Sequence, residues 1–197
     1  MRVIGGRFRS RLLTAPKGAA TRPTSDRLRE TLFNVLAPRI AGAQFVDLYA
    51  GTGAVGIEAL SRGAGRVWMA EKAEPALRAM RANLKSLGIE SEAEVDARGS
   101  MALLERLAKA QTRVDVVFLD PPWEAEAEYE RTLEFLGSER VRAMLAENAT
   151  VIAEHSAKKH LAERYGTLLR TRELTQGDAG LSFYAIISAE MQHKDLV

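Results

Sequence analysis

Three glycines, Gly51, Gly53 and Gly56, follow a short apolar stretch and precede a helical pattern, and their spacing is Gly-x-Gly-x-x-Gly. Residues 45–50 have the composition of a buried strand, and residues 54–62 have that of a helix. Glycine at a strand-to-helix turn lets the backbone turn sharply and approach a ligand closely, because no side chain stands in the way. The turn therefore favours folds in which a buried strand leads directly into a helix beside a ligand.

The rest of the chain continues this alternation of strands and helices. Apolar runs and turn signals predict strands at 45–50, 66–71, 93–97, 114–120, 149–154, 169–175 and 181–188. Periodicity and helix-end signals predict helices at 25–36, 54–62, 75–87, 100–110, 125–136, 138–146 and 157–164. Strands separated by helices favour a Rossmann-like α/β fold, with a mostly parallel seven-stranded sheet, helices on both faces and an antiparallel last strand. We divide the chain into a basic N-terminal extension at 1–39 (a hairpin and a helix), the α/β domain at 40–188 and a polar tail at 189–197.

Two carboxylates indicate the chemistry of the ligand at the glycine turn. Asp47 lies four residues before Gly51, and Glu71 ends the second predicted strand. A carboxylate at the position of Glu71 can accept hydrogen bonds from ribose hydroxyls. The negative charge of Asp47 would oppose a pyrophosphate but suits the ammonium group of S-adenosyl-L-methionine. We therefore expect S-adenosyl-L-methionine as the cofactor, with a dinucleotide or a purely structural turn as the alternatives.

A second motif, Asp120-Pro121-Pro122-Trp123, follows the strand at 114–120, whose carboxyl end should face the glycine turn. Two consecutive prolines remove two N–H donors, which leaves the Asp120 carboxylate and the Pro121 carbonyl as acceptors. Acceptors on both N–H groups of an exocyclic amine orient its lone pair and stabilise the positive charge that develops during methyl transfer. Trp123 offers a flat face on which a base can stack. The alternative is an ordinary Pro-Pro loop after a buried strand.

Basic residues are concentrated near the N-terminus. Residues 1–39 contain nine Lys or Arg and two Asp or Glu, a net charge of +7, whereas the remaining residues carry −5. This asymmetry is typical of a nucleic-acid-binding arm on a nearly neutral body, and a solvated charged segment without a partner is the alternative. Cysteine is absent and the three histidines are scattered, so we expect neither disulfides nor a metal site. No apolar run has membrane-spanning length and no signal peptide is evident, so we expect a cytoplasmic protein.

Several segments resemble known methyltransferases. The acid-x-aromatic-x-Gly-x-Gly pattern at 47–53 is similar to motif I of class I methyltransferases, and residues 120–123 are similar to motif IV of enzymes that methylate amino groups. Residues 22–34, RPTSDRLRETLFN, resemble a segment of the RsmD family, bacterial methyltransferases of guanine N2 in 16S ribosomal RNA. The resemblance covers residues 2 to about 187 and includes Glu-His-Ser at 154–156. Two roles are open for the polar residues of this segment, which either line the site or hold the N-terminal arm to the core: Arg22, Asp26, Arg29, Glu30 and Asn34.

The resemblance implies a guanine-N2 methyltransferase that acts on 16S ribosomal RNA within a small ribosomal subunit or an assembly intermediate, as a monomer. The implied catalytic residues are Asp120, Pro121, Pro122 and Trp123. The implied cofactor-binding residues are Asp47, Tyr49, Ala50, Gly51, Thr52, Gly53, Glu71, Lys72, Ser100 and Met101, with Asp96 as an alternative contact to adenine. The residues expected to bind RNA are Arg2, Arg7, Arg9, Arg11, Lys17, Arg22 and Arg27. The alternatives are a DNA adenine-N6 methyltransferase and an RNA-binding protein whose methyltransferase fold is inactive.

Overall fold

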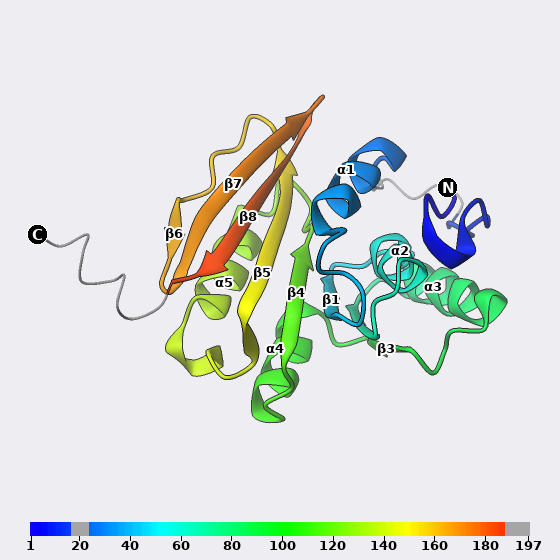
Figure 1. The fold of residues 1–197 in the computed structure, drawn as a ribbon, viewed down its shortest axis with the longest axis horizontal. Coiled ribbons are helices and arrows are strands. Elements are labelled where there is room, and N and C mark those ends of the chain that lie inside the picture. Colours follow the sequence, from blue (N-terminus) through cyan, green and yellow to red (C-terminus); the bar gives the residue numbers. More distant parts are fainter. Residues whose placement is uncertain (17–23, 188–197) are drawn as a thin grey trace, which may run out of the picture.

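The computed structural model describes residues 1–16 and 24–187 (Figure 1). One sheet is formed by β1 (Gln44–Leu48), β2 (Arg66–Ala70), β3 (Ala93–Asp96), β4 (Val114–Leu119), β5 (Leu145–Ser156), β6 (Arg164–Tyr165), β7 (Leu168–Gln176) and β8 (Ala179–Ile186). The helices are α1 (Asp26–Leu36), α2 (Ala54–Ser61), α3 (Glu74–Leu87), α4 (Ser100–Lys109) and α5 (Glu126–Leu136). Two short 3-10 turns, η1 (Gly6–Phe8) and η2 (Glu139–Val141), complete the described elements.

The sheet has the strand order β3-β2-β1-β4-β5-β8-β7-β6. Strand β1 pairs in parallel with both β2 and β4, so the order reverses direction between β1 and β4. Strand β8 lies antiparallel between β5 and β7, which confirms the expected antiparallel last strand. Ligands of open α/β sheets bind at the carboxyl ends of the strands at such a reversal. The glycine turn after β1 and the Asp-Pro-Pro-Trp turn after β4 both lie at this point.

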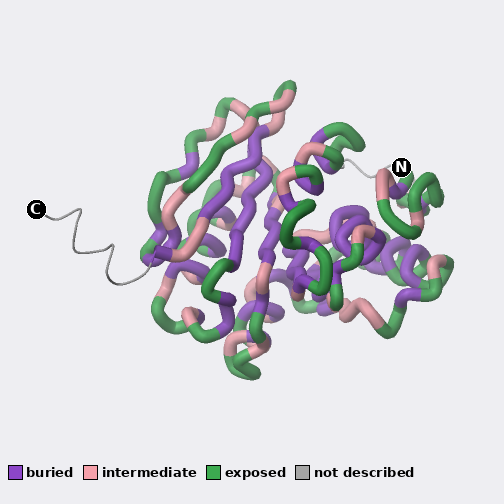
Figure 2. Tube along the Cα trace, in the orientation of Figure 1, coloured by how far each residue is buried: buried purple, intermediate pink, exposed green. Residues whose placement is uncertain are grey.

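Helices cover both faces of the sheet and enclose two hydrophobic cores. Helices α1, α2 and α3 pack on one face, and α4 and α5 pack on the other (Figure 1). Successive residues of the central strands alternate between the cores, as the pleat requires: Phe45 and Val116 face the first, and Val46 and Val117 face the second. The central strands are consequently buried over most of their length (Figure 2). This fixed centre positions the turns at its carboxyl edge.

Helix boundaries follow from local signals that the sequence contains. The Ser25 side chain accepts a hydrogen bond from the Leu28 N–H at 3.1 Å and caps α1. Pro75 lies in the first turn of α3, and Gly88 ends that helix in the left-handed conformation with φ 68°. No helix within 1–16 and 24–187 combines the length and the apolar character needed to span a bilayer.

Two predicted helices are wrong, and the sheet has one more strand than expected. Residues 138–146 form only η2 before β5 begins at Leu145, because pairing with β4 takes precedence over the helix-like spacing of Val141, Met144 and Leu145. Residues 157–164 contain good helix formers, but Leu161 is the one buried apolar side chain among them. A helix this short needs the burial of an apolar face to offset the free-energy cost of nucleation, and this segment has no such face. The chain instead turns and forms the two-residue edge strand β6.

The first part of the N-terminal extension, residues 2–12, is a closed loop rather than the expected hairpin. A single antiparallel bridge joins Arg2 and Leu12 around η1. Val3 and Leu13 are buried in the same hydrophobic cluster as α1, α2 and the central strands. The predictions for Lys17, for Arg22 and for the tail at 189–197 lie outside the described residues.

Candidate active site

The glycine turn between β1 and α2 has three residues with positive backbone φ angles, two of them glycines. Tyr49, Gly51 and Gly53 have φ values of 66°, 55° and 80°, in the left-handed region. A Cβ on Gly53 would lie 2.9 Å from Met80 Cγ, whereas a Cβ on Gly51 would meet no atom within 4 Å. The turn is therefore packed tightly on its inner side at Gly53 and has open space at Gly51.

Asp47 lies beneath this turn with its carboxylate aimed at the start of α2. Its Oδ2 accepts a hydrogen bond from the Gly56 N–H at 2.9 Å, and the side chain is almost completely buried. Burial, together with the charges of Glu71 and Glu154, raises the pKa of Asp47 to about 7 against the opposing effect of the Gly56 hydrogen bond. Asp47 therefore holds the turn directly, in addition to supplying negative charge to the site.

Glu71 organises the turn from the end of β2. Its carboxylate accepts hydrogen bonds from the backbone N–H groups of Gly51 at 2.9 Å and of Lys72 and Ala73 at 2.7 Å. An ionised carboxylate has about four acceptor positions, so about one remains for a ribose hydroxyl. The glycine turn and the acid at the next strand end, 20 residues apart, are brought into contact as the sequence predicts.

The end of β3 is occupied by an ion-pair cluster. Asp96 receives hydrogen bonds from the Arg98 side chain at 3.0 and 2.7 Å and from Arg106 at 3.4 Å, and these arginines lower the pKa of Asp96 to about 2. Gly99 has a φ of 97°, and a Cβ added to it would lie only 2.2 Å from Lys72 Cε. The Lys72 side chain therefore occupies the space that a side chain at position 99 would need. Ser100 begins α4 in a buried position, with Met101 half-buried beside it.

The tyrosine of the glycine turn reaches across to α5. The Tyr49 hydroxyl donates to Glu128 Oε2 at 2.7 Å and lies 3.1 Å from Thr132 Oγ1. The neighbouring residues of the turn are fixed by their backbones: the Ala50 N–H bonds the Ala70 carbonyl at 2.8 Å, and the Thr52 carbonyl accepts from Asn83 at 3.1 Å. Residues 49–53 thus form one turn, with Glu71 bonded to Gly51 and Ser100 hydrogen-bonded to Tyr49.

The Asp-Pro-Pro-Trp turn is braced by Tyr129 of α5. The Tyr129 hydroxyl is 3.2 Å from the Pro121 carbonyl oxygen and 3.0 Å from the Glu154 carbonyl oxygen. A carbonyl has two lone pairs, so Pro121 retains one acceptor position beside Tyr129. Pro121 is buried, Pro122 is exposed and Trp123 is half-buried.

Three buried or partly buried carboxyl groups meet at the carboxyl ends of adjacent strands β1, β4 and β5. Burial raises the pKa of Asp120 well above its usual range, the charges of Glu154 and Asp47 raise it further, and a hydrogen bond with Thr24 lowers it. Thr24 Oγ1 donates to Glu154 Oε2 at 2.8 Å across a separation of 130 residues. The glycine turn and the Asp-Pro-Pro-Trp turn therefore share one acidic site.

Thr24 and Glu154 are the site residues that the sequence did not identify. A signal for Glu154 was present, because an acidic residue inside the buried strand at 149–154 needs a partner. Thr24 gave no such signal, because Thr24 and Ser25 are equally good helix caps by composition and only the contact with β5 separates their roles.

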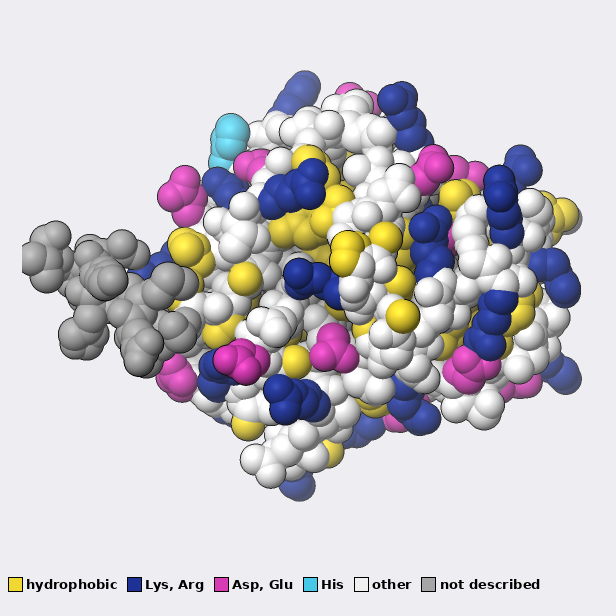
Figure 3. Space-filling view, viewed as in Figure 1, with side chains coloured by type: hydrophobic (Ala, Val, Ile, Leu, Met, Phe, Trp, Pro, Cys, Tyr) yellow, Lys and Arg dark blue, Asp and Glu magenta, His cyan; other side chains and the backbone are white. Residues whose placement is uncertain are grey.

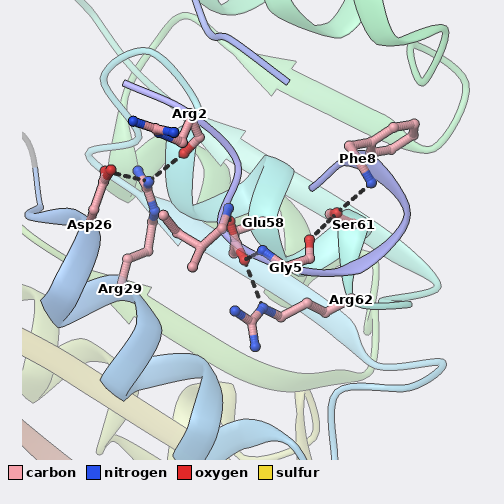
Figure 4. Close-up of polar contacts among 9 residues, drawn as sticks. Arg2, Gly5, Phe8, Asp26, Arg29, Glu58, Ser61 and Arg62 are labelled. Carbon is pink, nitrogen blue, oxygen red and sulfur yellow. Dashed lines mark hydrogen bonds and ion pairs between the residues drawn. The ribbon is translucent and has the colours of Figure 1, made fainter. Parts of the chain in front are cut away.

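The N-terminal extension is held to α2 by the buried carboxylate of Glu58 (Figure 4). Glu58 accepts hydrogen bonds from the Ile4 N–H at 2.7 Å, the Gly5 N–H at 2.8 Å and Arg62 Nε at 2.7 Å. The fully buried Arg29 of α1 donates to the Arg2 carbonyl at 2.6 Å and to Asp26 at 2.9 Å. Arg29, paired with Asp26, therefore ties the first residues of the extension to α1.

The cationic side chains of the extension point outward. Lys and Arg side chains gather over the part of the molecule that residues 1–16 occupy (Figure 3). Arg7 forms an ion pair with Glu92, and Arg11 Nη2 lies 3.4 Å from the Ser86 carbonyl. The exposed arginines of the described part of residues 1–39 are Arg2, Arg7, Arg9, Arg11, Arg27 and Arg39. Arg7 and Arg11 lie beside the end of α3 and the segment that follows it, whereas Arg27 is on α1.

The composition of the site fits S-adenosylmethionine better than a dinucleotide. Asp47, Glu71, Asp120 and Glu154 are all acidic, and a cationic sulfonium with an ammonium group complements them, whereas a pyrophosphate would be repelled. No group of three or more His, Asp or Glu side chains in the described parts of the chain is placed to hold a metal ion.

Comparison with known proteins places the chain among methyltransferases. Residues 1–185 match the sequence model of the family described as "Conserved hypothetical protein 95". The chain is 36% identical to "Putative rRNA methyltransferase YlbH" of Bacillus subtilis, over 93% of this chain and 98% of that protein. It is 34% identical to "Ribosomal RNA small subunit methyltransferase D" of Escherichia coli K12, over 93% and 89% of the two chains. The solved structure "Putative methyltransferase yhhF from Escherichia coli" is similar with a TM-score of 0.80 and 34% identity, over 94% of this chain and 97% of that one.

Proposed function

The chain belongs to the family described as conserved hypothetical protein 95, the RsmD family of methyltransferases, and on that basis we propose that it methylates the exocyclic N2 of a guanine in 16S ribosomal RNA. The proposed methyl donor is S-adenosyl-L-methionine. The observation that carries the proposal is the acceptor-rich turn at Asp120 beside the glycine turn, at the strand reversal where α/β sheets bind ligands. The relatives named for ribosomal RNA support the substrate class.

The proposed chemistry needs acceptors at the amine and little else from the chain. When bound, S-adenosylmethionine supplies a methyl group on a positively charged sulfur, which keeps the bonding electron pair as the methyl group passes to nitrogen. Asp120 and the Pro121 carbonyl accept the two N–H groups of the amine, which aims its lone pair at the methyl group. The nitrogen becomes positively charged and then loses one proton, for which the Asp120 carboxylate is the nearest acceptor in this arrangement. Trp123 at the mouth of the turn provides the stacking surface for a base that has left its helical stack.

The proposed cofactor contacts use the turn residues in their observed positions. Asp47 contributes negative charge toward the ammonium group while holding Gly56, and Glu71 has acceptor capacity left for a ribose hydroxyl. Lys72, Ser100 and Met101 border the place proposed for the adenine. Asp96 is a weaker candidate for this contact because Arg98 and Arg106 already occupy its oxygens.

The proposed RNA-binding segment is the basic extension at 1–39. Its arginines would contact phosphates, which positions an RNA without reading its sequence. The proposed substrate is a small ribosomal subunit or an assembly intermediate, bound by a monomer in the cytoplasm.

Methyl-labelled S-adenosylmethionine, offered with small ribosomal subunits from cells that lack this modification, tests the proposal. Label in N2-methylguanosine of 16S ribosomal RNA is the expected result, and label in N6-methyladenine of a parallel duplex DNA sample would overturn it. Asp120→Ala should abolish transfer while RNA affinity is retained. Glu124→Ala, an exposed acid in the same turn, is the matched control and should leave the rate unchanged. Unchanged turnover of Asp120→Ala would remove Asp120 from the mechanism.

A further inference from the structure

Asn83 of α3 bonds both the N-terminal extension and the glycine turn. Its Oδ1 accepts the Thr14 N–H at 2.7 Å, and its Nδ2 donates to the Thr14 carbonyl and to the Thr52 carbonyl, each at 3.1 Å. Asn83 is almost completely buried, with 1% of its surface exposed. A single side chain therefore joins a segment proposed to bind RNA to a turn proposed to bind the cofactor.

Only one orientation of the Asn83 amide satisfies all three contacts. A primary amide has two N–H donors on its nitrogen and an acceptor on its oxygen. The Thr14 N–H needs the oxygen, and both carbonyls need the nitrogen, so exchanging the two atoms would break every contact. With Thr14 in place, the amide is held toward Thr52. Without Thr14, rotation of the side chain costs only the bond to Thr52.

The bond to Thr52 fixes one peptide plane of the glycine turn. The Thr52 carbonyl shares that plane with the Gly53 N–H, which donates to the Ala50 carbonyl at 2.8 Å. Gly53 has a φ of 80°, and glycine adopts other backbone conformations without a steric penalty, so residue type alone does not hold the plane. Asn83 therefore restrains the turn where glycine leaves the chain most freedom. A site held in its binding conformation before the ligand arrives binds more tightly, because less ordering accompanies binding.

The glycine turn and the extension each have supports of their own. Glu71 holds the turn from the end of β2, and Glu58 holds the extension from α2. Leu13, next to Thr14, is buried in the hydrophobic cluster that includes residues of α1, α2 and α3. The Asn83 amide connects these two sets of contacts.

We propose that Asn83 is a positioning residue that couples the docking of residues 1–16 to ligand binding at the glycine turn. The docked extension holds the Asn83 amide toward Thr52 and so favours the binding conformation of the turn, and a bound ligand in turn stabilises the docked extension. Both effects have the same size, because docking and binding form one thermodynamic cycle. The inference rests on the proposed function for the identity of the ligand, S-adenosylmethionine. The basic extension is then held in place most firmly when the methyl donor is bound.

Amide hydrogen exchange at Phe8 measures the docking equilibrium with and without the ligand. The Phe8 N–H donates to Ser61 Oγ at 3.0 Å, and none of the substitutions used in the test alters that hydrogen bond. In the wild-type protein, saturation with S-adenosylmethionine should slow exchange at Phe8 about tenfold, which lies within the usual range of coupling between two sites. Unchanged exchange at Phe8, in a complex that calorimetry shows to be saturated, would overturn the inference.

Asn83→Ala and Leu13→Ala separate coupling from docking. Both variants should speed exchange at Phe8 in ligand-free protein, because both remove contacts that hold the extension. Saturation with S-adenosylmethionine should still slow this exchange about tenfold in Leu13→Ala but should leave it almost unchanged in Asn83→Ala. Equal slowing in the two variants would limit Asn83 to docking and would overturn the inference. Asn148→Ala, the same substitution at an exposed position of β5, is the matched control and should behave like the wild-type protein.

Two further measurements keep the test decisive. If Asn83→Ala does not fold, Asn83→Asp, which has the same shape but no amide donors, takes its place in the comparison. If the wild-type protein binds no S-adenosylmethionine, the proposed function fails, and ligand-free Leu13→Ala decides the coupling by itself. The Gly53 N–H should then exchange faster together with Phe8, because undocking releases the turn through Asn83. Faster exchange at Phe8 with unchanged exchange at Gly53 would overturn the inference.

Discussion

Glu58→Gln should release residues 1–16 from the body of the protein. In the folded chain, one buried carboxylate accepts the N–H groups of Ile4 and Gly5 as well as Arg62 Nε. Glutamine has the same shape, but one of its two terminal atoms is an N–H donor that faces these donors. The substitution therefore leaves a buried N–H without an acceptor and removes the charge from the hydrogen bonds that remain.

These contacts set the free energy by which Glu58→Gln weakens the docking of residues 1–16. An unsatisfied buried N–H costs about 1–3 kcal/mol, and a hydrogen bond that loses its charged acceptor weakens by about 1 kcal/mol. The sum, about 2–4 kcal/mol, corresponds to a roughly 30- to 1000-fold increase in the equilibrium constant for undocking. The loss of global stability should be no larger than the docking free energy of the segment.

Amide hydrogen exchange measures this opening at individual residues. The amide of Phe8, which donates to Ser61 Oγ at 3.0 Å, is the best reporter, because the substitution does not alter its own hydrogen bond. It should exchange faster together with Ile4 and Gly5 if the segment undocks as a unit. Glu74→Gln, the same change in an exposed ion pair with Arg78, should have almost no effect. Unchanged protection at Ile4 and Gly5 would refute the anchoring role, and loss confined to these two residues would refute cooperative docking.

Three further results are expected. Asp47→Asn should flatten the pH dependence of stability. Burial raises the pKa of Asp47 from 3.8 to about 7, so between these pH values the folded chain holds a proton that the unfolded chain has lost. The free energy of unfolding of the wild-type protein, measured in urea, should therefore fall by up to about 4 kcal/mol as the pH rises through that interval. Asn83→Ala removes the amide that joins the extension to the glycine turn, so calorimetry should show weaker cofactor binding, and an unchanged affinity would argue against this link. Replacing Arg7, Arg9 and Arg11 with Ala should lower RNA affinity and reduce the slope of its salt dependence by about 2, and an unchanged slope would exclude them from RNA contact.

The sequence was sufficient for the central strands β1, β2 and β4, because these are short, strongly apolar and followed by helices or turns with clear signals. Ser25, Pro75 and Gly88 occupy the helix-end positions that their chemistry predicts. The glycine turn and the turn at Asp120 could be placed together because parallel strands bring their carboxyl ends to one edge.

Long-range polar contacts were beyond sequence reasoning. Glu58 and Glu154 are acidic residues in otherwise apolar segments, which indicates that each has a buried partner but not which one. Their partners, Ile4 and Thr24, are 54 and 130 residues away and are brought close only by the folded sheet. The helix predicted at 138–146 failed for the same reason, because pairing with β4 decides the conformation of that segment.

The separation of 130 residues between Thr24 and Glu154 has a consequence for the order of events during synthesis. Thr24 leaves the ribosome long before Glu154 has been added, so its hydroxyl has no carboxylate partner while β1 to β4 are being made. The glycine turn can form early from contacts among neighbouring strands, but the corner at Asp120 closes only after β5 has paired with β4. A nascent chain that already contains the complete glycine turn therefore still lacks the finished turn at Asp120, and the proposed active site should be completed only when β5 docks.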